Sequence, residues 1–183
     1  MLYKKFFMLL SLMSFSLGCI NAHAITHAGN VNVRVTGSVY IPACSINNGQ
    51  TVEIDFGNIS PTIPSSMKKI VKTINLSCPY YEGKPYVSIS GNTVDHNGSK
   101  LLASSMSGLA IALYQGDSDT RLEFGEGISN GERFIGYEIK SGISAINTEN
   151  STFKFSAEPV VYDGNALSPG DFSASASMSI SYF

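Results

Sequence analysis

The chain has 183 residues, of which 14% are charged, and its formal net charge at pH 7 is −2. A mildly acidic chain with scattered charge does not favour binding to nucleic acid. Its length is typical of one domain, and no apolar run beyond the first 24 residues is long enough to span a membrane.

The first 24 residues have the pattern of a secretory signal peptide. Lys4 and Lys5 precede an apolar run, and the Ala-His-Ala of residues 22–24 is a small-residue cleavage motif. We expect the mature chain to begin at Ile25, which removes two lysines and brings the formal charge to −4. Lipoprotein processing at Cys19 is the alternative, although the residues before Cys19 match that motif poorly.

Loss of this leader leaves one pair of cysteines, Cys44 and Cys78. Two cysteines in an exported chain of this size predict one disulfide. The remaining histidines, His27 and His96, lie far apart in the sequence, so we expect no metal site and no cofactor.

Short alternating runs separated by turn residues recur along the chain. This pattern predicts one antiparallel β-sandwich with about eight to ten strands and no helix. In the first half, the residue pattern predicts two loops, at 60–64 and 92–100, and strands at 30–41, 51–56, 68–78 and 85–90.

In the second half, residues 109–115 are apolar on both faces, which predicts a buried strand. Their alanines and leucines also make them the best helix candidate. Weaker strands are expected at 121–124 and 133–139. A long strand is expected over 151–162, with Pro159 as a candidate break, and a turn cluster at 164–171 precedes the last strand.

The chain ends on its most regular alternation, because every second residue of 172–182 is apolar and serines lie between them. Termini usually fray, so a strand pattern at the end of a chain requires a partner. The N-terminal run 30–39 alternates as well. The two runs are compatible with pairing inside one sandwich, or with an arm of one chain completing the sheet of the next by β-strand addition.

Motifs for catalysis or metal binding are incomplete. The S-x-x-K of residues 65–68 lacks the partner motifs of serine acyl-enzymes, so we expect a solvated turn there. Residues 95–98 and 117–119 resemble fragments of calcium loops without the remaining ligands, and we expect turns there too. The sequence therefore predicts a protein that is not an enzyme.

Residues 37–60 (GSVYIPACSINNGQTVEIDFGNIS), followed by KTINLSCPY at 72–80, are similar to the chaperone–usher pilins. The similarity continues in residues 107–116, 151–160 and 170–183, so it covers essentially the whole mature chain. Within this family the chain most resembles the minor, adaptor-type tip subunits of P pili.

This resemblance implies an all-β fold, an incomplete immunoglobulin-like β-sandwich that lacks its last strand. A donor strand from another chain completes it. The implied organisation is a signal peptide at 1–24, an N-terminal donor-strand arm at 25–40 that runs into the first strand, and a pilin domain at 41–183.

The resemblance also implies functional residues. Cys44 and Cys78 match the family disulfide. The donor arm corresponds to Val31, Val33, Val35, Gly37 and Val39, where Gly37 suits a point at which backbones approach closely. The groove and chaperone-binding strand corresponds to Gly170, Phe172, Ala174, Ala176, Met178, Ile180, Tyr182 and Phe183. Phe183 departs from the alternation, so we expect its carboxylate to matter more than its ring.

The implied partners are a periplasmic pilus chaperone, an outer-membrane usher, neighbouring pilins and the tip adhesin, with no nucleic acid and no stable membrane insertion. The implied route leads through the periplasm of a Gram-negative bacterium to the extracellular fimbrium. Two alternatives stay open, a self-complete secreted β-sandwich that binds carbohydrate and the major rod pilin of the same family.

Overall fold

The computed structural model describes residues 29–63, 66–164 and 167–183. The expected signal peptide, the alternative at Cys19 and the serine of the S-x-x-K motif lie outside these residues. The chain divides into two units, Met1–Ser38 and Val39–Phe183. In the first unit, residues 29–38 form no helix or strand, and the valines of the predicted arm are exposed to solvent.

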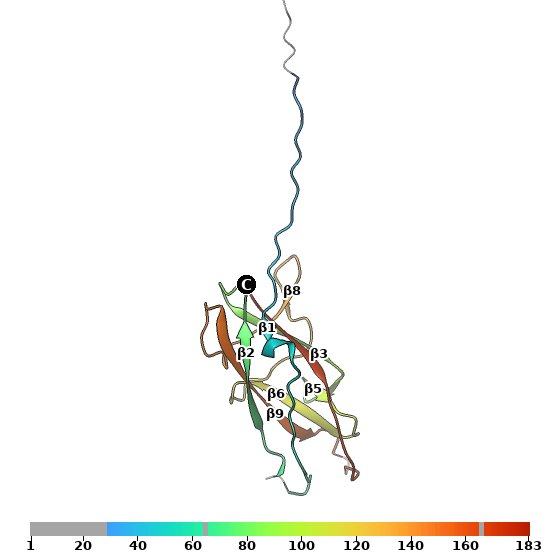
Figure 1. Cartoon of the computed structure of the whole chain (residues 1–183). Coiled ribbons are helices and arrows are strands. Elements are labelled where there is room, and N and C mark those ends of the chain that lie inside the picture. The colour runs from blue at the N-terminus through green and yellow to red at the C-terminus, as the bar shows by residue number, and fades with distance from the viewer. Residues whose placement is uncertain (1–28, 64–65, 165–166) are drawn as a thin grey trace, which may run out of the picture. The chain divides into compact units, whose positions relative to one another are not determined.

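The second unit is all-β, with ten strands and one short 3-10 helix in its described part (Figure 1). This confirms the predicted class and number of strands. A six-stranded sheet has the order β1-β2-β9-β6-β5-β4, and a four-stranded sheet has the order β10-β3-β8-β7. The elements are β1 Ser45–Ile46, η1 Asn47–Gly49, β2 Ile70–Ser77, β3 Pro85–Gly91, β4 Thr93–His96, β5 Ser99–Ala103, β6 Leu109–Gln115, β7 Ile128–Ser129, β8 Phe134–Glu138, β9 Asn150–Val161 and β10 Ala176–Tyr182.

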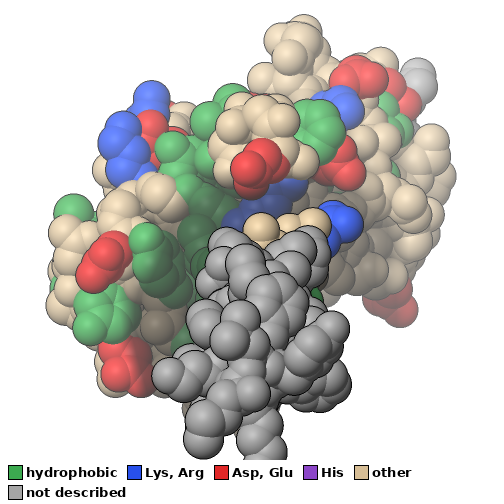
Figure 2. Space-filling model, turned by 90° about the horizontal axis from the view of Figure 1, so that it is seen from above, with side chains coloured by type: hydrophobic (Ala, Val, Ile, Leu, Met, Phe, Trp, Pro, Cys, Tyr) green, Lys and Arg blue, Asp and Glu red, His purple; other side chains and the backbone are tan. Residues whose placement is uncertain are grey.

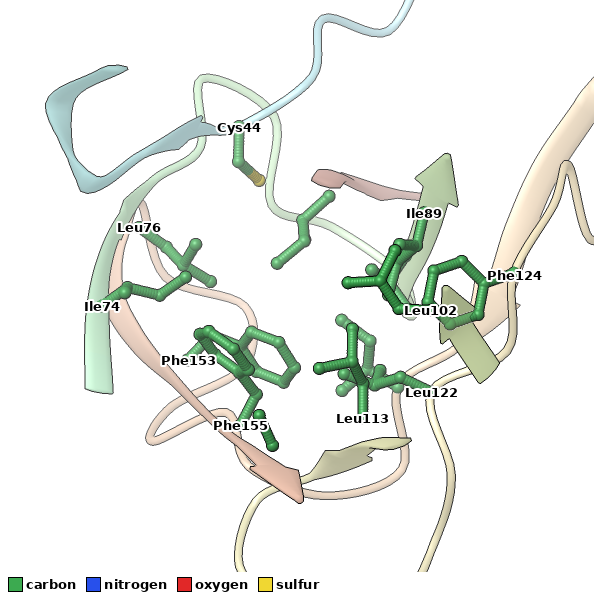
Figure 3. Close-up of a cluster of buried hydrophobic side chains, with 14 of the residues drawn as sticks. Cys44, Ile74, Leu76, Ile89, Leu102, Leu113, Leu122, Phe124, Phe153 and Phe155 are labelled. Atoms are coloured by element: carbon green, nitrogen blue, oxygen red, sulfur yellow. The ribbon is translucent and has the colours of Figure 1, made fainter. Parts of the chain in front are cut away.

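Apolar side chains from both sheets meet in one core (Figure 3). Ile74 and Leu76 of β2 and Phe153 of β9 come from the larger sheet, and Val87 and Ile89 of β3 come from the smaller one. Burial of each large apolar side chain contributes roughly 1.5–3 kcal/mol. The period-two pattern of the strands places these side chains on the inner face of each sheet, and their burial is the main driving force for the packing of the two sheets.

β6 is buried on both faces, as the sequence predicted, and it is a strand and not a helix. Ile111 and Leu113 point into the core between the sheets, whereas Ala110, Ala112 and Tyr114 belong to a second apolar cluster on the other face. Apolar side chains cover both faces of β6, one in the core and one in the second cluster, which explains the absence of polar alternation.

Pro159 does not break β9, contrary to its role as a candidate break. Tyr162, directly after β9, donates its N–H to the carbonyl of Gly108, so the even-numbered residues of β9 bond to β6. The backbone of Pro159, an odd-numbered residue, therefore faces β2. β2 begins at Ile70, which is paired with Ala157. The missing N–H of proline therefore lies beyond the end of β2, where no ladder bond is lost.

The expected polar loop at 92–100 is wrong. These residues form most of the antiparallel hairpin of β4 and β5, in which His96 pairs with Ser99. Asn97 and Gly98 form the two-residue turn, with φ angles of 51° and 78°. Positive φ at both positions is the geometry that Asn-Gly favours in hairpins, so the sequence contained the signal but its polar strands obscured it.

Three other strand predictions fail. Residues 30–41 and 51–56 form no ladder, and residues 121–124 contribute only an isolated bridge between Arg121 and Tyr114. The side chains of 51–56 still alternate between exposed and half-buried, so the pattern was correct and only the hydrogen-bonded neighbour is missing. No helix in the described ranges is long and apolar enough to cross a membrane.

Candidate functional site

β10 uses one edge of its backbone to pair with β3. Phe183 donates its N–H to Lys84 (2.9 Å) and accepts the N–H of Lys84 (2.8 Å), and Ser179 occupies the equivalent position opposite Ser88. Successive residues of a strand direct their hydrogen bonds to opposite sides. Odd-numbered residues of β10 therefore bond to β3, and even-numbered residues present their N–H and C=O groups to the other side.

On the side of β10 away from β3, the backbone is hydrogen-bonded at Ile180 and unpaired at earlier residues of the strand. The carbonyl of Ile180 accepts the N–H of Cys44 at 2.8 Å. No other described residue forms a ladder with this side of β10, which leaves the backbone of Ala176 and Met178 unpaired there. We call the outer backbone and side-chain edge of residues 174–178 the open edge. Such an edge is a template for pairing with another strand.

Residues 51–56 form the opposite wall. Val52, Ile54 and Phe56 are half-buried and pack against the core, whereas the residues between them are exposed. The ring of Phe56 stacks on that of Phe172 with centroids 6.3 Å apart, so the two walls meet again below the open edge. In Figure 1 these segments are the teal chain before β2 and the red chain that leads into β10.

A pocket of about 630 Å³ lies at this lower end and is lined by both walls. Residues 54–61 contribute one side and residues 167–172 the other, with the side chains of Met106 and Leu109 also lining it. Gly170, a predicted site residue, lies here with no atom close to the place of a Cβ. The pocket is mixed in character, since Asp55 and Asp171 lie beside the apolar residues.

The contact between Phe56 and Phe172 gives a first prediction. A double-mutant cycle of Phe56→Leu and Phe172→Leu is expected to yield a coupling energy of about 1 kcal/mol, the usual range for a stacked aromatic pair. Chemical denaturation of the four proteins measures it. Ile59→Val replaces Phe172→Leu in the control cycle, and equal coupling in both cycles would contradict a specific contact between the walls.

The predicted residues of the last strand divide into two groups. Ile180 and Tyr182 are fully buried and already fill the core. Ala174 and Ala176 are exposed, and Phe172 and Met178 are half-buried. The exposed alanines mark the part of the apolar face that the domain itself does not cover. The ring of Phe183 packs edge-on against Tyr86, with centroids 6.0 Å apart.

Tyr182 gives a pH-dependent prediction. Its buried hydroxyl has no hydrogen-bond partner among the described residues, and burial raises the pKa of the phenol above 10.0. The folded chain therefore keeps this proton to higher pH than the unfolded chain. The resulting stability is fully present below about pH 10 and is lost as the pH rises through the raised pKa.

We expect Tyr182→Phe to be as stable as the parent or more stable at neutral pH, because it removes an unsatisfied hydroxyl. It should also lose less stability at alkaline pH. Denaturation midpoints from about pH 8 to about pH 11 measure this slope. Tyr81→Phe, at an exposed ring, is the control. Equal alkaline slopes for the two variants would contradict the assignment.

Cys44 and Cys78 form the predicted disulfide. Cys78 is fully buried after β2, and Cys44 precedes β1. The bond therefore fixes the start of the wall at 51–56 to the six-stranded sheet, next to the contact between Cys44 and Ile180.

The residues of the predicted arm lie outside regular structure. Val31, Val33 and Val35 are exposed by 82%, 79% and 87%, and Val39 is exposed by 100%. Gly37 has no atom within 4 Å of the place of a Cβ. These valines alternate as in a β-strand, but in the described part of the chain no neighbouring strand pairs with them.

Sequence reasoning did not include Phe56, Met106 and residues 167–169 in the site. The alternation of TVEIDF contained a signal for Phe56, because it places this ring on the same face as Val52 and Ile54. Nothing local distinguishes Met106 or the turn at 167–169, since only the folded chain brings them to the pocket.

The structure offers little for other chemistry. In the described part of the chain, no three His, Cys, Asp or Glu side chains gather in a way that could hold a metal ion. Asp119 forms an ion pair with Lys69 at 3.0 Å, a structural role for that acidic turn. The face shown in Figure 2 carries both signs of charge, scattered among apolar side chains. What the arrangement can do is bind an extended strand.

Comparisons with known proteins agree with the motifs in the sequence. A family model described as "Fimbrial protein" matches residues 27–183. The chain is 39% identical over 155 residues to the fimbrial adapter PapF and to the minor fimbrial protein PrsF, both of Escherichia coli, and each match covers 84% of this chain and 88% of the relative. The solved structure of the P pilus adaptor subunit PapF is similar with a TM-score of 0.51 and 34% identity, covering 80% of this chain and 100% of that chain.

Proposed function

The chain belongs to the fimbrial protein family, and from this premise we propose that it is a minor, adaptor-type subunit of a chaperone–usher pilus. In this role it accepts a donor strand at the open edge of β10 and gives its own arm to a neighbour. The 39% identity to a fimbrial adapter and to a minor fimbrial protein supports this assignment over that of a rod subunit. The subunit has a structural role in presenting the tip adhesin and needs no catalytic chemistry.

The observation that carries the proposal is the open edge itself. Ala174 and Ala176 present an apolar, solvent-exposed surface beside unpaired backbone groups of β10. An incoming strand would form hydrogen bonds with the unpaired backbone groups and would cover the two exposed alanines. In a lone chain the same edge favours aggregation. The proposal therefore includes a periplasmic chaperone that lends a strand and an outer-membrane usher at which the next subunit's arm replaces it.

The arm has the chemistry to fill such an edge. Val31, Val33, Val35 and Val39 share one face of an extended segment. Full burial of four valines contributes about 6–8 kcal/mol before ordering costs, at about 1.5–2 kcal/mol for each. We propose residues 25–40 as the donor arm and residues 41–183 as the pilin domain that receives the arm of another chain. This domain reaches the extracellular fimbrium through the periplasm.

The deciding experiment uses the mature chain in three conditions: alone, with the chaperone of its own pilus system, and with a peptide equivalent to the arm of a neighbouring subunit. We expect aggregation or proteolysis of the chain alone, and a stable one-to-one complex in the other two conditions. A stable lone monomer that binds neither chaperone nor peptide would indicate a self-complete sandwich. Assembly into long fibres of this subunit alone would indicate a rod pilin.

The two roles of the chain can be separated at Gly37. Gly37→Leu is expected to prevent this subunit's arm from entering a neighbour, because a side chain at this position meets the opposing backbone. The groove of the same variant should still accept a donor peptide with the affinity of the parent. Ser38→Leu, on the other face of the arm, is the control. Equal loss of donating and accepting activity would mean that Gly37 is needed for folding.

A further inference from the structure

Exposed apolar side chains gather at one end of the six-stranded sheet. Ser77, the last residue of β2, pairs with Ser45 of β1 and with Asn150 of β9. The segments that precede Ser45, follow Ser77 and precede Asn150 therefore leave the sheet at the same end, the upper end in Figure 1. These segments carry three large exposed side chains, which we call the joint surface: Tyr40, Tyr81 and Ile146.

Two loops of the joint surface are held to the disulfide and to each other. The N–H of Cys78 donates to the carbonyl of Glu149 at 2.7 Å. The side-chain amide of Asn147, oriented as its acceptors require, donates to the carbonyl of Tyr81 at 3.2 Å. Tyr81 and Ile146 are thus presented by hydrogen-bonded loops, so little ordering is required when a partner binds there.

The linker between this end of the domain and the proposed donor arm is too short for a free joint. Cys44 is fixed in the domain, because it is buried, bonded to Cys78 and hydrogen-bonded to Ile180. In the proposed function, Val39 is buried in the groove of the neighbouring pilin. The chain from residue 39 to residue 44 spans at most about 18 Å when fully extended, and Pro42 restricts its rotation further. The surfaces of the two domains therefore meet beside this linker.

Tyr40 differs from the other residues on its face of the arm. The even-numbered residues from Asn32 to Ser38 are all polar, which suits a face turned to water while the odd-numbered valines enter a groove. Tyr40 continues the polar face but is aromatic, and 75% of it is exposed in the single chain. Tyrosine is enriched in the cores of protein interfaces. Its place at the base of the arm therefore favours contact with a protein surface.

We propose that the joint surface binds the rim of the groove in the neighbouring pilin that accepts this chain's arm, and thereby fixes the angle between the two domains. The inference rests on the proposed function and adds a contact outside the groove. The arm supplies strand pairing, whereas Tyr40, Tyr81 and Ile146 supply apolar contact between domain surfaces. Because arm and joint surface belong to one chain, the second contact forms at high effective concentration once the arm is bound.

Hydroxyl-radical footprinting of the complex between the mature chain and its neighbouring pilin tests this contact. The chain's own groove is filled with a donor peptide throughout. Labelling of Tyr40, Tyr81 and Ile146 should fall at least about threefold when the complex forms, because residues in the core of an interface lose most of their exposure. Ile63 is the internal control, since it is exposed like Ile146 but precedes β2, at the opposite end of the sheet.

Two variants separate the contact from strand pairing. In the parent complex, NMR relaxation should give both domains one common rotational correlation time. Tyr40→Ser combined with Ile146→Ser should give each domain a shorter time of its own, whereas Ile63→Ser should behave as the parent does. Insertion of Gly-Ser-Gly-Ser between residues 40 and 41 should also uncouple the domains and abolish the protection of Tyr81, because a flexible linker no longer holds the surfaces together. The arm of every variant should still enter the neighbour's groove.

The outcomes are distinct. A stable complex whose joint surface stays as reactive as in the single chain would overturn the contact while leaving the proposed function intact. Independent tumbling of the two domains in the parent complex would do the same. Protection of these side chains without the neighbour would also overturn it, because it would assign the surface to self-association. Failure of the parent's arm to enter the neighbour would refute the proposed function itself.

Discussion

Ala176→Tyr is expected to weaken the binding of a donor strand strongly while leaving the fold intact. Ala176 lies on the open edge and is exposed, so a larger side chain there displaces no core residue. Surface substitutions of this kind usually change stability by less than about 0.5 kcal/mol. The added ring, however, occupies the space that the side chains of an incoming strand need.

The expected loss is large. Exclusion of two arm valines from the groove removes about 3–4 kcal/mol, which is a decrease of about 100-fold or more in affinity for the donor peptide. Titration of the peptide into the subunit measures it, after release of the chaperone. Ser177→Tyr is the matched control, because Ser177 is also exposed but its side chain lies on the opposite face of the strand from Ala176. Equal binding by the two variants would show that the strand does not lie on this face.

The second large effect is expected from the disulfide. Cys44→Ala combined with Cys78→Ala should lower the free energy of unfolding by about 4 kcal/mol in the chain-entropy model, given the separation of 34 residues between the cysteines. Alanine avoids the cost of a buried serine hydroxyl at Cys78. A domain of ordinary stability has only about 5–15 kcal/mol in total, so this loss is a substantial fraction.

Denaturation of the complex with donor peptide measures this loss without interference from aggregation. The parent protein in strong reductant provides an independent control and should lose a similar amount. A difference below about 1 kcal/mol between parent and variant would contradict the expected role of the bond. We also expect weaker peptide binding, because the same cysteine anchors the wall at 51–56 beside the carbonyl of Ile180.

Sequence reasoning recovered the strands whose side chains decide their own burial. β2, β3, β9 and β10 alternate, and β6 is apolar from Leu109 to Tyr114, so each was predicted close to its observed place. The hairpin of β4 and β5 was missed because Asp95, His96, Ser99 and Lys100 are polar on an edge of the larger sheet. The extended residues 51–56 were predicted as a paired strand because periodicity reports which side chains face inward and not which backbone groups are bonded.

The site was predictable only in part for the same reason. The alternation of 172–182 placed all six apolar residues on one face, but it could not separate Ile180 and Tyr182, which fill the core, from Ala174 and Ala176, which stay exposed. That distinction depends on where the opposite wall ends. The close approach between Gly83 and Phe183 joins residues that most of the folded domain separates in sequence, so no local pattern could predict it.

The alternation of bonding directions in β10 limits how a bound strand can move. A strand displaced by one residue would turn its valines to solvent, so it can slide only in steps of two residues, about 6.6–6.8 Å each. Each such step also moves Val35 or Val39 to the place of Gly37, where we expect a side chain to meet the opposing backbone. We therefore expect the glycine to make one register of the proposed arm more favourable than the registers two residues away.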